Sequence, residues 1–202
     1  MTARKKEGLS RRDFLGVTGA LAGAGLVGGA ASGEDEKPRP PGPLGLGPAA
    51  VALTLRVNGR ALSVQAEPRE TLLDVLREKA DLTGAKKACD RGECGSCTVL
   101  MDGRAVYACM VLAFQARGRE IRTVEGLAQG EELHPVQRAF LEHDGYQCGF
   151  CTPGQVMTTV ALLEKNPSPT PEDARAGLCG NLCRCAAYNK ILESALAAAK
   201  GK

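Results

Sequence analysis

The chain has 202 residues, of which 44% are hydrophobic and 24% are charged, as expected for a globular protein of one or two small domains. Only 3% of its residues are aromatic and none is tryptophan, which argues against platforms for stacking nucleic-acid bases. Residues 1–32 carry the whole net charge of +3, because they hold five basic and two acidic side chains. The rest of the chain is neutral, so we expect no nucleic-acid partner and no binding to a charged membrane surface.

Residues 1–32 have the layout of an export signal, in which a basic region precedes an uncharged run. The stretch SRRDFL from Ser10 resembles a twin-arginine signal, and small residues near Ser32 indicate a cleavage site. The alternative is an ordinary secretory signal that happens to carry two arginines. The uncharged run has 18 residues, 11 of them Gly or Ala, which is too weakly apolar for a membrane anchor. We therefore predict a periplasmic protein with no stable membrane insertion after cleavage.

The segment 33–50 is rich in proline and glycine and is predicted to be a linker. In residues 51–66 apolar and polar side chains alternate around Asn58-Gly59, which predicts a β-hairpin with a type I′ turn. Residues 71–84 have the apolar spacing of a helix, with Gly84 as its expected end. Residues 98–109 form a second predicted hairpin.

The first group of cysteines begins in the loop after the predicted helix and ends with the last residue of the second predicted hairpin. Their spacing, with four, two and eleven intervening residues, is that of a plant-type [2Fe–2S] site: Cys89, Cys94, Cys97 and Cys109. Gly92 and Gly95 would let the loop wrap tightly and turn backbone N–H groups toward the sulfurs. A structural zinc site or two disulfides are the alternatives, although zinc favours paired Cys-x2-Cys knuckles.

The second half of the chain changes to helical periodicity. Four short helices are predicted, which together make a small bundle: 132–145, 155–167, 170–178 and 189–200. Two cysteine motifs lie in its loops, Cys148-x2-Cys151 and Cys183-x1-Cys185. If both loops lie at the same end of the bundle, four thiols meet. Spacing alone allows zinc here as well as iron–sulfur, and the first site favours a second redox centre.

The stretches CDRGECGSC, QCGFCTPGQ and GNLCRCAAYNKIL resemble the small iron–sulfur subunit of the molybdenum hydroxylases, the xanthine dehydrogenase and aldehyde oxidoreductase family. The resemblance covers about residues 51–195. It implies an α+β fold, with a β-grasp ferredoxin-like domain (51–125) followed by a four-helix bundle (126–202) and one [2Fe–2S] cluster in each. The export signal is closest to the periplasmic aldehyde oxidoreductase branch.

The resemblance also implies a role for each cysteine. The first group would hold the outer cluster, and Cys148, Cys151, Cys183 and Cys185 would hold the inner one. Gln147 and Cys185 would lie near a molybdopterin that belongs to a separate large subunit. No residue matches a catalytic nucleophile or base, so substrate oxidation is expected on that partner, and electrons would pass through both clusters to a subunit carrying FAD or to a haem-containing cytochrome.

Three positions depart from the usual family pattern. Cys179, the ninth and unpaired cysteine, stands where the family usually has serine, and we expect a buried, unreactive thiol. Ala88 stands where glycine is common and Ala186 where glycine or threonine is common. Because alanine tolerates a positive φ poorly, both are expected to shift the geometry of their loops slightly.

The sequence thus predicts the electron-transfer subunit of a molybdenum-dependent aldehyde oxidoreductase. Within the family the alternative substrates are an N-heterocycle, a purine or carbon monoxide. The alternative of another class is an exported binding protein stapled by zinc or disulfides, with no redox role.

Overall fold

The computed structural model describes residues 47–201 of the chain. The predicted signal peptide and most of the predicted linker lie outside these residues. None of the helices within 47–201 is long and apolar enough to cross a membrane.

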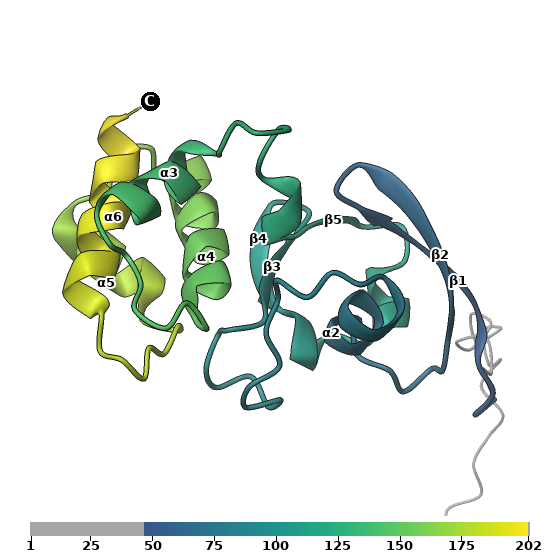
Figure 1. Cartoon of the computed structure of the whole chain (residues 1–202). Coiled ribbons are helices and arrows are strands. Elements are labelled where there is room, and N and C mark those ends of the chain that lie inside the picture. The colour runs from purple at the N-terminus through teal and green to yellow at the C-terminus, as the bar shows by residue number, and fades with distance from the viewer. Residues whose placement is uncertain (1–46, 202) are drawn as a thin grey trace, which may run out of the picture. The chain divides into compact units, whose positions relative to one another are not determined.

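A five-stranded mixed sheet forms the first half of this region (Figure 1). Strands β1 (Val51–Val57) and β2 (Arg60–Ala66) make the predicted hairpin, and both turn residues have the positive φ of a type I′ turn. Strands β3 (Thr98–Met101) and β4 (Arg104–Tyr107) make the second hairpin. The order is β2-β1-β5-β3-β4, because β5 (Glu120–Arg122) pairs in parallel with β1 and antiparallel with β3.

The predicted helix over residues 71–84 is shorter than expected and is only partly α-helical. It consists of α2 (Leu72–Asp74) followed by the π-helix η1 (Val75–Lys79). Thr71 caps its start, and the expected end at Gly84 is wrong. The chain leaves the helix at Asp81, whose φ of 56° breaks helical geometry, and an acidic side chain tolerates that conformation better than most.

Three single-turn 3₁₀ segments join these elements: η2 (Ala108–Met110), η3 (Ala113–Ala116) and η4 (Val124–Gly126). All four predicted helices of the second half are confirmed, with ends that differ by a few residues. They are α3 (Pro135–Glu142), α4 (Thr152–Lys165), α5 (Pro171–Leu178) and α6 (Tyr188–Lys200).

Two hydrophobic cores lie side by side within one compact unit, residues 45–202. The first core packs the sheet against α2 and η1, and the second packs the four helices together. Strand β3 serves both, because Val99 points into the first core while its neighbour Leu100 points into the second. Helix α4 therefore packs directly on β3.

Candidate iron–sulfur centres

The first cysteine group, which we call the outer site, is Cys89, Cys94, Cys97 and Cys109, and its thiols meet in two pairs. The Cys89 and Cys94 thiols share a hydrogen bond, and the Sγ atoms of Cys97 and Cys109 lie 3.4 Å apart. Cys109 reaches the loop because the β3–β4 hairpin returns it beside Cys97, whose carbonyl accepts the N–H of Ala108.

Backbone donors surround the more exposed pair of the outer site. Gly92 and Gly95 have φ values of 77° and 68°, as the predicted tight wrapping requires. The N–H of Glu93 donates to the Cys89 sulfur at 3.4 Å. Burial acts to raise the pKa of Cys89, but this donor, those of neighbouring residues and the Cys94 thiol lower it to about 7. The loop thus favours a thiolate before any metal is bound.

The second group, which we call the inner site, is Cys148, Cys151, Cys183 and Cys185, and its thiols also pair. Cys148 shares a hydrogen bond with Cys185, and Cys151 shares one with Cys183. The first pair lies at the surface, where Cys148 is exposed, and the second is buried. Gln147 is exposed beside Cys148. The predicted contacts of the molybdopterin are thus accessible, since Gln147 is exposed and Cys185 is half-buried.

The pKa values of two buried cysteines, Cys97 and Cys151, are raised, whereas that of Cys89 is lowered. Burial, reinforced by the neighbouring thiols, raises the pKa of Cys97 and of Cys151 to about 12. Metal ligands must be thiolates, so binding at these two positions has to release protons. Cys151 stands at the start of α4, where unpaired N–H groups favour negative charge.

Two pairs of thiols suit a binuclear cluster, because each of its two irons would take two cysteine ligands. All nine cysteines are free, and 3.4 Å between Cys97 and Cys109 is far longer than the roughly 2 Å of a disulfide. The side chains present therefore fit a [2Fe–2S] cluster at each site.

Comparison with known proteins agrees with one [2Fe–2S] cluster in each half of this region. Residues 55–128 match a family model described as a 2Fe-2S iron-sulfur cluster binding domain, and residues 123–196 match a [2Fe-2S] binding domain. The chain is 42% identical over 203 residues to the aldehyde oxidoreductase iron-sulfur-binding subunit PaoA of Escherichia coli O157:H7, covering 91% of this chain and 85% of that protein. It belongs to the iron–sulfur subunits of the molybdenum hydroxylases.

Other relatives and solved structures extend the comparison. The nicotine 6-hydroxylase small subunit of Paenarthrobacter nicotinovorans is 52% identical over 146 residues, covering 72% of this chain and 88% of that one. Quinoline 2-oxidoreductase from Pseudomonas putida 86 superposes with a TM-score of 0.73 at 42% identity, covering 76% of this chain and 96% of that chain. This iron–sulfur subunit therefore transfers electrons within a multi-subunit molybdenum hydroxylase, and its two domains bind [2Fe–2S] clusters.

Residues 179–183 of the iron–sulfur subunit bridge its two sites. The N–H of Leu182 donates to the carbonyl oxygen of Cys94 at 2.9 Å, and Asn181 Nδ2 donates to the carbonyl of Gly95 at 3.0 Å. The Tyr107 hydroxyl donates to the carbonyl of Gly180 at 3.1 Å. Leu182 directly precedes Cys183 of the inner site. Its hydrogen bond to Cys94 therefore links the main chain of the two sites.

Glycines permit this close approach. A Cβ added at Gly154 in the first turn of α4 would lie 2.4 Å from the carbonyl oxygen of Gly95. One added at Gly95 would lie 2.5 Å from the carbonyl oxygen of Gly180. Sequence reasoning singled out Gly95 for its loop alone. It missed Asn181, which is almost fully buried and whose side-chain amide ties residues 179–183 to the outer loop at Gly95. We call this meeting point of the two sites the junction.

The expectation that Cys179 is buried is wrong. Cys179 is exposed at the C-cap of α5. Ala186 takes a left-handed φ of 57°, whereas Ala88 does not have a positive φ. The strain expected of the two alanines is thus confined to the loop that carries Cys183 and Cys185.

Proposed function

We propose that the chain is the electron-transfer subunit of an exported aldehyde oxidoreductase, and that Cys89, Cys94, Cys97 and Cys109 hold its outer cluster and Cys148, Cys151, Cys183 and Cys185 its inner one. When bound, each [2Fe–2S] cluster supplies one-electron redox chemistry. The observation that carries the proposal is the hydrogen bond between Leu182 and Cys94, which joins the two sites through main-chain atoms.

The inner site has an accessible side and a buried side, which indicates the direction in which electrons would pass through the subunit. Cys148, Cys185 and Gln147 form its accessible side, where a molybdopterin held by the large subunit would approach. Cys151 and Cys183 form its buried side, next to Leu182 and the outer site. Beside the outer loop, Met110 is exposed and packs over Gly92. A flavin subunit or a cytochrome would bind there as acceptor.

Aldehyde is favoured as the substrate, oxidised to a carboxylic acid on the large subunit, because PaoA matches 91% of the chain. The test is anaerobic reduction of the purified complex by an aldehyde, with electron paramagnetic resonance (EPR) used to follow both clusters. An N-heterocycle, a purine and carbon monoxide are the comparison substrates. If one of these reduces the clusters and aldehydes do not, the substrate is wrong while the electron-transfer role stands. A colourless protein with tightly bound zinc would overturn both.

Export by the twin-arginine pathway to the periplasm is the remaining part of the proposal, supported by Arg11-Arg12 followed by Phe14-Leu15. That route is suited to a chain whose clusters are inserted before transport. Replacing both arginines with lysine should leave the protein loaded with clusters in the cytoplasm. Unchanged delivery to the periplasm would show that an ordinary secretory signal is at work.

A further inference from the structure

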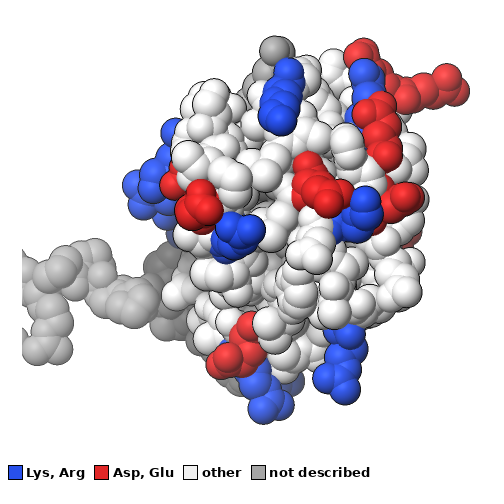
Figure 2. Space-filling model, turned by 90° about the vertical axis from the view of Figure 1, so that its left-hand side faces the viewer, with Lys and Arg blue, Asp and Glu red and all other residues white. Residues whose placement is uncertain are grey.

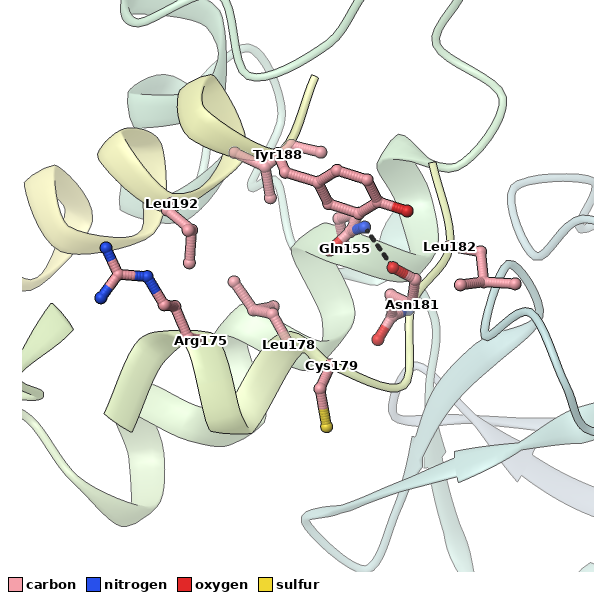
Figure 3. A pocket seen from close by; sticks show the side chains of 9 residues that line it. Gln155, Arg175, Leu178, Cys179, Asn181, Leu182, Tyr188 and Leu192 are labelled. Atoms are coloured by element: carbon pink, nitrogen blue, oxygen red, sulfur yellow. Dashed lines mark hydrogen bonds between the residues drawn. The ribbon is translucent and has the colours of Figure 1, made fainter. Parts of the chain in front are cut away.

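A pocket of about 300 Å³ opens on the helical half, between α4, α5, α6 and the segment that follows α5 (Figure 3). Leu178 and Leu192 face each other across it from α5 and α6, and Arg175 stands at its rim (Figure 3). Tyr188 forms another wall, and Gln155 of α4 lies at the back. The thiol of Cys179 points away from Tyr188 and Leu192 in this view, so it does not fill the pocket.

Gln155 leaves one strong hydrogen-bond acceptor unused in this apolar pocket. The residue is 1% exposed, and its Nε2 donates to the carbonyl of Asn181 at 3.1 Å. That bond fixes the orientation of the side-chain amide, and its Oε1 has no partner. A buried acceptor without a donor is destabilising. The pocket therefore fits an occupant that combines an apolar body with an N–H or O–H donor.

The pocket is continuous with the accessible side of the inner site. Leu182 and Tyr188, which are 53% and 41% exposed, line both this pocket and the adjoining hollow that contains Cys148, Cys151 and Cys183. Phe150 adds a further exposed aromatic ring to that hollow. Figure 2 shows this side of the molecule, where Lys, Arg, Asp and Glu side chains are scattered among uncharged ones. Exposed apolar side chains gathered around a buried site indicate a protein–protein contact.

We propose that the pocket is a docking socket for the molybdopterin-binding subunit, which inserts an apolar side chain and donates a hydrogen bond to Gln155 Oε1. The inference rests on the proposed function, because that subunit is the partner that must reach Cys148 and Cys185. A flavin subunit or cytochrome would dock near Met110 instead. The socket also bears on the junction, since Gln155 holds the carbonyl of Asn181 and the amide of Asn181 holds the outer loop.

A cysteine at the rim reports directly on whether the partner covers the socket. In a Cys179→Ser background, Arg175→Cys places an exposed thiol at the mouth, and Ser168→Cys places one on the exposed loop between α4 and α5 as the matched control. Alkylation by iodoacetamide is followed by mass spectrometry in the cluster-loaded chain alone and in the complete complex. We expect the rim thiol to react roughly tenfold or more slowly in the complex, because only the free fraction reacts, and the control thiol to react equally in both. Equal reaction of the rim thiol in both states overturns the proposal.

Filling the socket tests the same proposal through affinity. Leu192→Trp places a large ring where Leu192 projects into the pocket, and Leu192→Ile is the control of equal volume. We expect Leu192→Trp to retain both EPR signals and to bind the large subunit roughly tenfold more weakly, since the inserted side chain is displaced. Wild-type affinity with both signals present overturns the docking socket alone. Absence of the two [2Fe–2S] signals from the wild-type chain would instead overturn the proposed function.

Discussion

Gly154→Ala tests whether close contact between α4 and the outer loop holds the two sites together. The added Cβ would lie 2.4 Å from the carbonyl oxygen of Gly95 and 3.0 Å from the Cα of Ser96, and both are main-chain atoms that cannot swing aside. An ordinary contact begins at 3.4 Å, so α4 and the loop must separate by about 1 Å. The bonds that Asn181 and Leu182 donate to the loop, now 3.0 and 2.9 Å, would then lengthen past the useful range.

The matched control is Gly177→Ala in α5, where the new Cβ would meet only the flexible end of Leu162 at 3.1 Å. Both changes gain the helix propensity of alanine, about 1 kcal/mol, so comparing the variants removes that contribution. Overpacking against a fixed backbone costs about 1–3 kcal/mol. We therefore expect the Gly154→Ala variant to be less stable than the control by that amount.

Thermal unfolding of the cluster-loaded chain, followed by far-UV circular dichroism, measures the difference. For a chain of this length 1 kcal/mol corresponds to about 2–4 °C in Tm. We also expect the amide of Leu182 to exchange its hydrogen faster in Gly154→Ala than in the control, since its acceptor has moved away. Equal Tm values together with unchanged exchange at Leu182 would refute the view that this contact sets the junction.

Three further predictions concern the loop of the inner site. Ala186→Gly should raise the free energy of unfolding by up to about 1 kcal/mol in chemical denaturation, because it relieves the left-handed φ of 57°; a loss of stability would contradict this. Tyr188→Phe frees the N–H of Cys183, which now donates to the tyrosine hydroxyl at 3.0 Å. That donor can then turn to sulfur, so a redox titration by EPR should show a higher potential for the inner cluster and an unchanged one for the outer, whereas a lower inner potential would count against it. Cys185→Ser should abolish the inner EPR signal and turnover and leave the outer signal, while Cys179→Ser keeps both; loss of the inner signal in Cys179→Ser would show the ligand assignment to be wrong.

Most of the fold could be predicted where a local signal was strong. Asn58-Gly59 specifies its turn through backbone preference, and Thr170 followed by Pro171 marks the start of α5. Strand β5 was missed, because three residues are too few to show alternation and its place depends on pairing with β1 and β3. The π-helical turn after Asp74 was missed for a similar reason, since apolar spacing does not separate it from an α-helix.

The candidate site shows the same division between local and long-range information. Cysteine spacing and resemblance indicated the eight proposed ligands, because ligand loops are short and their geometry is local. The junction was beyond reach, since contacts such as that of Asn181 with Gly95 join residues 86 positions apart. Exposure of Cys179 likewise depends on how the end of α5 is packed. Such facts appear only when separate elements are packed together.

The thiol pairs also impose an order on cluster assembly. In the outer site Cys89 pairs with Cys94 inside one short loop, and Cys97 pairs with Cys109 across one hairpin. In the inner site every pair joins the loop before α4 to the loop before α6. A chain still emerging from the ribosome can therefore present the complete outer site while half of each inner pair is unmade. Iron can be retained at the inner site only after the chain has been synthesised past Cys185 and the loop before α6 has met the loop before α4, so a loaded inner site reports that these two loops have come together.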